Sequence, residues 1–205
     1  MTAKFNLQEN SQPKYIKTRT VAYSLRSTVE KELVRLEKEG TITKVNHSEW
    51  DTPIVPVLKK KVTVNPVLKV DQYTLPKIED IFPQLARGHQ FTKLDLTQVY
   101  LQLPVHENSK ELVTINTHKG LYTYNRMPFG IASAPAICQR TIEEVLQGIP
   151  GVQVMLDDMI ITGKDDQEHL QNLDKVLVRL EEYRLRLNLD KCQFFKNSYI
   201  LWTHY

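Results

Sequence analysis

The chain has 205 residues, of which 41% are apolar, so it is long enough to bury one sizeable core. Its 27 Lys and Arg residues against 24 Asp and Glu residues leave a charge of +3, too small to identify a nucleic-acid-binding protein by itself. No apolar run could span a membrane and the polar start has no signal-peptide core, so we expect a soluble, unsecreted, intracellular protein of the cytoplasm or nucleus. Cys138 and Cys192 lie far apart, without the paired spacing of a metal site, which favours reduced thiols.

The start of the chain predicts an extended segment followed by a helix. Residues 1–26 are polar and irregular, so we expect an extended lead-in. Ser27 and Glu30 have the spacing of a capping box, which predicts that a helix begins there, and Gly40 predicts its end. The apolar face of this helix would consist of Val29, Leu33 and Leu36.

Short strands and one short helix are expected in the middle of the chain. Residues 42–45 and 53–58 are rich in strand formers, and residues 77–85 favour a short helix. Residues 112–124 predict a hairpin whose turn lies at 119–120.

Two longer helices are expected further on. Pro135 suits an early helical position, and helical spacing continues to Gly148, so we expect this helix to lie behind the hairpin formed by residues 152–162. Asp165 or Asp166 can cap the last helix. Its apolar stripe against the sheet would consist of Leu170, Leu173, Leu177 and Leu180.

Two adjacent carboxylates, Asp157 and Asp158, lie between apolar runs at 152–156 and 159–162, which places them at the tip of a predicted hairpin. The ordinary interpretation is a solvated turn, because Asp is common in turns. Two neighbouring like charges repel each other, however, so a divalent cation between them is the alternative explanation for the pair.

A third acid, Asp95, favours the metal interpretation. It lies within the run 91–103, whose residues are typical of a half-buried strand, where a lone carboxylate is costly unless it is paired or bound to metal. Three carboxylates from a strand and a hairpin suit Mg²⁺, which prefers oxygen ligands and substrate phosphates. The chemistry that fits such a site is phosphoryl or nucleotidyl transfer.

Several motifs follow one another in a fixed order along the chain. They occupy residues 50–57, 93–96, 127–136, 156–158 and 191–195, with Tyr100 between the second and the third. In this order they resemble the motifs of reverse transcriptases from gypsy-type LTR retrotransposons and retrovirus-like Pol polyproteins. The resemblance covers nearly the whole chain.

The resemblance implies an α+β fold with a polymerase palm, an antiparallel sheet backed by helices, and a fingers subdomain. The whole domain would cover residues 27–205. The fingers would take approximately residues 27–90 and part of 105–135, and the palm approximately 91–104 and 136–205.

The resemblance also assigns roles to the acids. Asp95, Asp157 and Asp158 would be the catalytic residues and the ligands of two Mg²⁺ ions, for which Mn²⁺ is a possible substitute. The partners would be an RNA or DNA template with its primer, deoxynucleoside triphosphates and the remainder of the Pol polyprotein. No membrane is expected among them.

Four further residues would line the nucleotide site: Leu96, Tyr100, Phe129 and Gly130. Tyr100 matches the aromatic residue that excludes a 2′-hydroxyl, although a Tyr in such a strand more often serves core or cross-strand packing. Read without the resemblance, Phe129 and Gly130 belong to an ordinary apolar turn into a helix.

The nucleic-acid contacts that the resemblance suggests are weaker: Lys59, Lys60, Lys61, Arg126 and Met155, with Lys119 as a further basic candidate. Relatives carry an additional turn and strand where Lys60 here runs directly into Lys61, so we expect incomplete fingers. Met155 replaces a Tyr of the family pattern, while residues 197–205 lack a glycine-containing turn. We also expect the thumb and ribonuclease H regions to be absent from this chain.

Three functional hypotheses remain open on sequence alone. The first is a retroelement reverse transcriptase domain fragment that transfers nucleotides onto a primer. The second is a catalytically inactive, nucleic-acid-binding remnant of the Pol polyprotein, which the shortened fingers favour. The third is a small α+β interaction protein with an incidental acidic hairpin, and the three intact acids argue against it.

Overall fold

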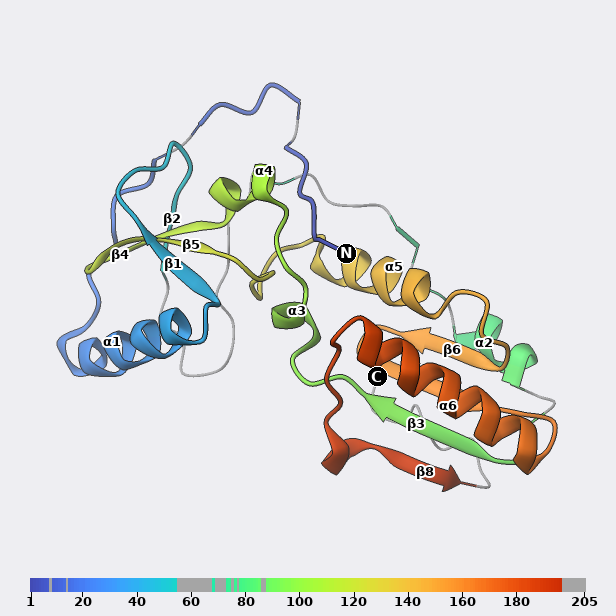
Figure 1. Ribbon diagram of the computed structural model, residues 1–205. Coiled ribbons are helices and arrows are strands. Elements are labelled where there is room, and N and C mark those ends of the chain that lie inside the picture. Colours follow the sequence, from blue (N-terminus) through green and yellow to red (C-terminus); the bar gives the residue numbers. More distant parts are fainter. Residues whose placement is uncertain are drawn as a thin grey trace. The chain divides into compact units, whose positions relative to one another are not determined.

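The computed structural model describes residues 1–7, 9–13, 15–54, 68, 73, 74, 76, 78–85 and 88–196, with the backbone alone at 78, 82 and 84. The chain divides into two compact units, and the described residues of each form one four-stranded sheet (Figure 1). The first unit combines Met1–Gln72 with Tyr100–Ala134, and the second combines Tyr73–Val99 with the chain from Pro135 onward. Within these described ranges, no helix is long and apolar enough to cross a membrane.

The sheet of the first unit has the strand order β1-β5-β4-β2. Its strands are β1 (Ile42–Val45), β2 (Thr52–Pro53), β4 (Thr114–Thr117) and β5 (Gly120–Tyr124). β4 and β5 form the predicted antiparallel hairpin, with its turn one residue earlier than expected. β1 pairs antiparallel with β5, whereas β2 pairs parallel with β4. Residues 55–58 of the predicted strand 53–58 lie outside the described residues.

Helix α1 (Tyr23–Lys38) begins four residues before the predicted start, so the capping-box prediction is wrong. Its N-cap is Ala22, and no side chain caps the N-terminus of the helix, so no capping residue marks the true start in the sequence. Leu33 is the buried residue of the expected apolar face, while Val29 and Leu36 are half-buried. The end is as predicted, because Gly40 has the left-handed φ of +69° just beyond the last turn.

The described residues before α1 pack into the first unit, and the last four residues of the predicted lead-in, 23–26, belong to α1 instead. The backbone N–H of Ala3 donates to the carbonyl of Pro104 at 2.7 Å, and Ala3 is buried. The buried carboxylate of Asp51 accepts from the N–H of Ile16 at 2.6 Å and from Nδ2 of Asn116 at 2.9 Å. Asp51 therefore joins the lead-in to strand β4.

The sheet of the second unit has the order β6-β7-β3-β8 and is antiparallel throughout. Its strands are β3 (Phe91–Asp95), β6 (Val152–Met155), β7 (Asp158–Thr162) and β8 (Gln193–Lys196). The helices of this unit are α2 (Ile78–Leu85), α5 (Ala134–Leu146), of which Ala134 belongs to the first unit, and α6 (Asp166–Glu182). The prediction of an antiparallel sheet backed by helices is therefore confirmed.

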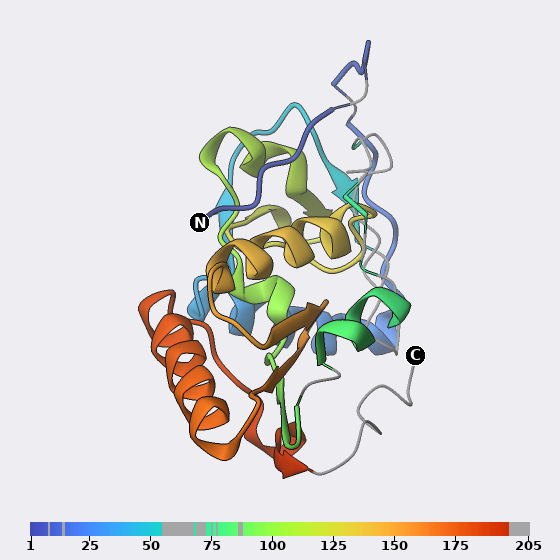
Figure 2. The same ribbon diagram turned by 90° about the vertical axis from the view of Figure 1, so that its right-hand side faces the viewer.

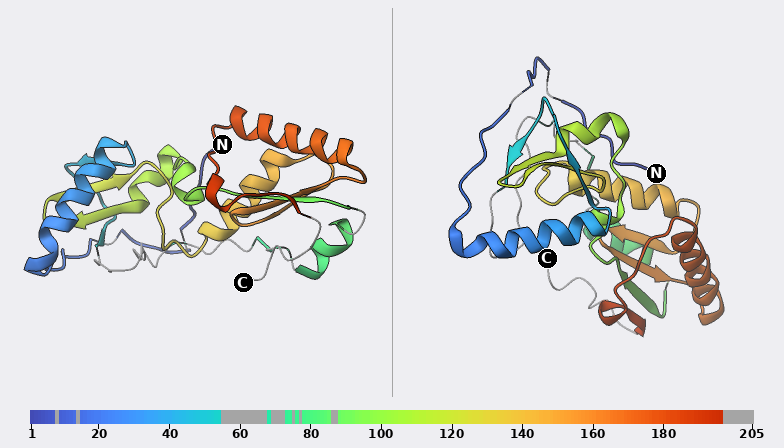
Figure 3. Two further views of the ribbon diagram at one scale, coloured as in Figure 1. Left: turned by 90° about the horizontal axis from the view of Figure 1, so that it is seen from below. Right: turned by 60° about the vertical axis from the view of Figure 1, so that its left-hand side comes forward.

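Helices α2 and α6 cover opposite faces of the second sheet (Figures 2 and 3). On one face, Ile81 and Leu85 of α2 form a buried cluster with Phe91 and Ile160 of the strands. On the other face, Thr92 Oγ1 and the Nε2 atom of His169 on α6 form a hydrogen bond of 2.8 Å. The core of the unit lies between the sheet and these helices, because burying the apolar side of each element stabilises both.

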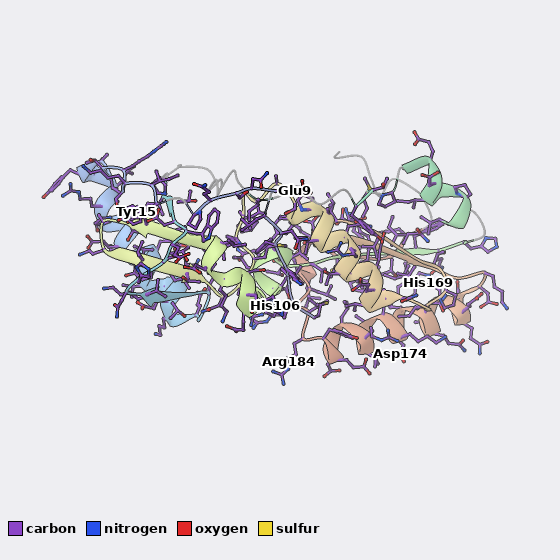
Figure 4. The ribbon with its side chains drawn as sticks, turned by 90° about the horizontal axis from the view of Figure 1, so that it is seen from above. Glu9, Tyr15, His106, His169, Asp174 and Arg184 are labelled. Atoms are coloured by element: carbon purple, nitrogen blue, oxygen red, sulfur yellow. The ribbon has the colours of Figure 1, made fainter. Side chains whose placement is uncertain are left out.

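Asp165 caps α6, since its Oδ1 accepts from the N–H of Glu168 at 2.8 Å. The predicted leucine stripe is only half right: Leu173 and Leu180 are buried, but Leu170 and Leu177 are 53% and 39% exposed. The face that packs on the sheet consists of His169, Asn172, Leu173, Val176 and Leu180. Figure 4 shows the side chain of Arg184, just beyond the helix, projecting away from the ribbon.

The predicted strand 91–103 is shorter than expected. Strand β3 ends at Asp95, and a turn through Gln98, with a left-handed φ of +44°, leads into a helix of four residues. The remaining short elements are α3 (Val99–Gln102), α4 (Glu107–Lys110) and the 3₁₀ helices η1 (Glu111–Val113) and η2 (Leu189–Lys191). Asp95 is therefore the last residue of its strand, a position where a polar side chain can face an open sheet end.

Candidate active site

Two of the predicted catalytic carboxylates face each other across adjacent strands of the second unit. Asp95 of β3 and Asp158 of β7 are direct partners in the antiparallel register. Cross-strand partners project from the same face of a sheet, with their Cβ atoms about 5 Å apart. Both residues are buried, at 6% and 3% exposure. The strand register thus brings together two acids that are 63 positions apart in the chain.

The third carboxylate lies in the hairpin turn, as predicted. Met155 of β6 pairs with Asp158, which leaves Leu156 and Asp157 as the two turn residues. Leu156 has a φ of +58°, an uncommon conformation for a residue with a branched side chain. The carbonyl of Asp157 accepts from the N–H of Leu96 at 2.9 Å, so the turn is joined to the chain just after β3.

Gln139 of α5 holds this turn from behind. Its side chain is fully buried, and its Oε1 accepts from the N–H of Leu156 at 2.6 Å. Its Nε2 donates to the carbonyl of Val154 at 2.8 Å and to Oε1 of Glu143 at 2.6 Å. The expectation that this helix lies behind the acidic hairpin is confirmed, and a side-chain amide fixes the unusual backbone of Leu156.

Two lysines contact the carboxylates. Nζ of Lys93 lies 2.7 Å from Oδ2 of Asp158, and Nζ of Lys191 lies 3.4 Å from Oδ2 of Asp95. Lys93 precedes Asp95 by two positions on β3, so both side chains project from the same face of the sheet. The acids of this cluster are therefore partly neutralised by residues of the chain itself.

Burial raises the pKa of Asp158 above its ordinary value, because a charged carboxylate is poorly solvated there. The hydrogen bond and charge of Lys93 lower this pKa in part, while the carboxylates of Asp157 and Asp95 raise it again. Burial, followed by the charge of Asp157, also raises the pKa of the nearby Cys138 thiol to about 12. Cys138 is therefore a neutral thiol at physiological pH and a poor metal ligand.

The donor set suits a divalent cation by its chemistry. Carboxylate oxygens are the ligands that Mg²⁺ prefers. The ammonium groups of the two lysines already contact these oxygens, so the site accommodates positive charge. As the side chains are placed, the described part of the chain has no group of three or more Asp, Glu, His or Cys residues gathered closely enough to hold a metal ion.

The candidates for nucleotide contact belong largely to the first unit. Tyr100 lies on the short helix α3, not in a strand as predicted, and it is half-buried. Its ring packs edge-to-face on Phe129, with the ring centroids 5.5 Å apart and the planes at 81°. Gly130 follows with a φ of +88°, which glycine adopts without strain.

The other predicted site residues have ordinary structural partners. Leu96, in the second unit, is buried at 1% exposure, and Met155 packs partly against the cluster beneath α2. The exposed Arg126 donates to the carbonyl of Gln102 at 3.0 Å, and Lys119 pairs with Glu30 at 3.2 Å. The candidates Lys59, Lys60 and Lys61 lie outside the described residues.

We did not predict from the sequence that three further residues lie beside the carboxylates: Lys93, Gln139 and Lys191. The two-residue spacing of Lys93 and Asp95 on a predicted strand was a usable signal for a shared face. Nothing in the local sequence indicated the role of Gln139, because it bonds backbone groups of a hairpin that begins 13 positions later. Lys191 contacts Asp95 from a segment 96 positions away.

The fold and the carboxylate arrangement define a class that comparison with known proteins identifies. Residues 53–202 match the family model described as reverse transcriptase (RNA-dependent DNA polymerase). The chain therefore belongs to the reverse transcriptase family. Two solved structures of the foamy viral protease-reverse transcriptase, one with double-stranded DNA and one with an RNA/DNA hybrid, share its fold with TM-scores of 0.77 at 22% identity. They cover 92% and 90% of this chain, which covers 35% and 26% of theirs.

Curated relatives indicate the kind of element from which the domain comes. An uncharacterized protein of Caenorhabditis elegans is 37% identical across 94% of this chain and 16% of its own length. The retrovirus-related Pol polyproteins of the Drosophila melanogaster transposons 297 and gypsy are 31% and 29% identical, across 94% and 92% of this chain. The chain spans about a fifth of each of those polyproteins. It is the reverse transcriptase domain of an LTR retrotransposon Pol, as the resemblance implied, and the inactive-remnant alternative is not favoured.

Proposed function

We propose that this domain catalyses template-directed addition of deoxynucleotides to a primer, using Asp95, Asp157 and Asp158 as its catalytic carboxylates. The observation that carries the proposal is the register pair of Asp95 and Asp158, with Asp157 in the adjoining turn. A structural sheet gains nothing from two buried acids on neighbouring strands, because their repulsion and desolvation both oppose folding. Lys93 and Lys191 offset only part of this cost, and a site for a divalent cation explains the remaining negative charge.

The three carboxylates would hold the two divalent ions that this family implies. When bound, Mg²⁺ would lower the pKa of the primer 3′-hydroxyl and neutralise the triphosphate and its leaving group, and Mn²⁺ is a possible substitute. The chain contributes position: Gln139 fixes the turn that carries Asp157, and the β3 and β7 register fixes the other two acids. The resulting catalysis is orientation and charge neutralisation.

The nucleotide would be selected by residues that the resemblance assigns. Tyr100, supported by the edge of Phe129, would exclude a 2′-hydroxyl, and Gly130 and Leu96 remain separate predictions for contact with the nucleotide. Lys59, Lys60, Lys61, Arg126 and Met155 remain predictions for contacts with the template and primer. The solved relatives that hold double-stranded DNA or an RNA/DNA hybrid support such a partner for this domain. The approximate fingers and palm boundaries also remain proposals.

The test is primer extension by the purified chain on an RNA template, with deoxynucleoside triphosphates and Mg²⁺ or Mn²⁺. We expect extension by the unmodified chain and none by the double variant Asp157→Asn, Asp158→Asn. The matched control is Asp174→Asn, which makes the same change at an exposed position of α6 and should extend normally.

Equal extension by the double variant would contradict the carboxylate assignment. A folded, primer-binding chain that never extends in either metal would instead identify a catalytically inactive domain. Circular dichroism and a primer-template binding assay on the same samples separate these outcomes from loss of folding.

A further inference from the structure

Lys93 occupies an unusual place for a lysine. It lies in the middle of β3, between β7 and β8, and only 18% of its side chain is exposed. Removing an ammonium group from water is costly unless it is paired, and its partner here is Asp158, whose side chain is 4% exposed. The pair is thus shielded from solvent, unlike the ion pairs on the helix surfaces.

The charges of the cluster nearly cancel without any bound ion. Asp95, Asp157 and Asp158 carry −3 when ionised, and Lys93 with Lys191 supplies +2, which leaves −1. A cluster of three unpaired acids would oppose folding, so the two lysines allow the domain to fold before a metal arrives. Lys191 contributes less to this, because its side chain is 64% exposed and its distance to Asp95 is longer.

We propose that Lys93 is a built-in counter-cation, which occupies the Asp158 carboxylate and is displaced when a divalent cation binds there. Lys93 then lowers the metal affinity of the site while it protects the metal-free fold. This inference rests on the proposed function, because it requires that the carboxylates bind metal.

The two states compete for the same oxygen. Nζ of Lys93 lies at 2.7 Å from Oδ2 of Asp158, while a Mg²⁺ ligand oxygen lies about 2.1 Å from its ion. An ammonium and a divalent cation on one oxygen would repel each other strongly in a site with little water.

The experiment measures Mn²⁺ binding to the whole chain by the electron paramagnetic resonance signal of free Mn²⁺. Lys93→Gln keeps a hydrogen-bond donor for Asp158 but removes the charge, so we expect a dissociation constant lower by on the order of tenfold. Lys93→Arg keeps the charge and should show no gain. Lys175→Gln, an exposed change on α6, is the matched control and should bind as the unmodified chain does.

A second readout follows the midpoint of thermal unfolding. Mn²⁺ should raise this midpoint more in Lys93→Gln than in the unmodified chain, since tighter binding to the native state stabilises it more. In the presence of a chelator the order should reverse, with Lys93→Gln less stable, because Asp158 has then lost its charged partner.

Equal Mn²⁺ affinity of Lys93→Gln and the unmodified chain would overturn the inference. Loss of Mn²⁺ binding in Asp158→Asn would show, in that case, that the carboxylate site itself is correctly assigned. Undiminished Mn²⁺ binding by Asp158→Asn would instead remove the proposed site itself. Absence of Mn²⁺ binding in every variant would overturn both the counter-cation and the metal site. Binding by Lys93→Gln alone would support the inference in its strongest form.

Discussion

The two units carry their candidate residues on different kinds of support. In the second unit, Asp95 and Asp158 belong to regular strands whose register is set over five consecutive pairs. In the first unit, Tyr100 lies on a helix of four residues, and Phe129 and Gly130 belong to the turn region before α5. A strand register fixes the face of every side chain at once, whereas a short helix depends on its packing.

The difference suggests a division of labour between the units. Groups that hold a metal ion tolerate little displacement, and the second unit places the carboxylates proposed for this role in two strands and in a turn that a buried amide supports. The candidates for nucleotide selection lie instead on a helix of four residues and in a turn. Substitutions should therefore separate loss of the carboxylate frame from loss of selectivity.

The largest effect on stability is expected from Gln139→Leu, which removes the side-chain amide that supports the turn carrying Asp157. Leucine has a similar size but cannot bond the N–H of Leu156 or the carbonyl of Val154, so both buried groups lose a partner. We expect the free energy of unfolding to fall by about 2–3 kcal/mol in urea titrations, because unsatisfied buried groups cost 1–3 kcal/mol each. Gln147→Leu, at an exposed position just after α5, is the control. Equal stability of the two variants would show that the amide does not support the turn.

A smaller and different effect is expected from Tyr100→Ala in the first unit. If the ring excludes a 2′-hydroxyl, the preference for deoxynucleotides over ribonucleotides in primer extension should fall by on the order of tenfold. Tyr100→Phe keeps the ring and should retain the preference. Mn²⁺ binding should not change in either variant, and a change there would mean that the two groups of residues are not separable.

The smallest effect concerns the stability of the metal-free chain. Burial raises the pKa of Asp158, so its ionised form destabilises the native state at pH 7. In the presence of a chelator, the unmodified chain should therefore gain stability relative to Asp158→Asn as the pH falls through the raised pKa, since its carboxyl then takes up a proton and is no longer penalised. The midpoints of thermal unfolding of the two proteins, compared from pH 7 downward, check this. A difference between the midpoints that stays constant with pH would mean that burial does not raise the pKa of Asp158.

Much of the fold could be predicted where local signals and packing agree. Gly40 predicts where α1 ends, and Pro135 predicts where α5 begins. The alternation of strand-forming residues predicts the two hairpins. The buried face of α6 could not be found by apolar spacing, because two of its members, His169 and Asn172, are polar. They are tolerated inside because His169 bonds Thr92 and Asn172 donates to the carbonyl of Thr162.

The site divides in the same way. The three acids were predictable, because paired carboxylates in a hairpin and one in a strand are unusual in a core. The residues that support them were not, because their contacts are made across the chain: Gln139 reaches backbone groups of the hairpin, and Lys191 approaches Asp95 from η2. A sequence pattern indicates which groups do the chemistry more readily than which groups hold them.

The joint between the lead-in and the first sheet has a practical consequence for how the domain is cut. Asp51 is 2% exposed, and one of its two bonded partners is the backbone of Ile16, in a segment that looks dispensable by composition. A shortened version starting at Tyr23, the first residue of α1, would leave that carboxylate desolvated and half satisfied and would remove the buried side chains of Phe5 and Val21. A truncation chosen only to begin at the start of α1 would therefore remove an N-terminal segment that packs against the first sheet.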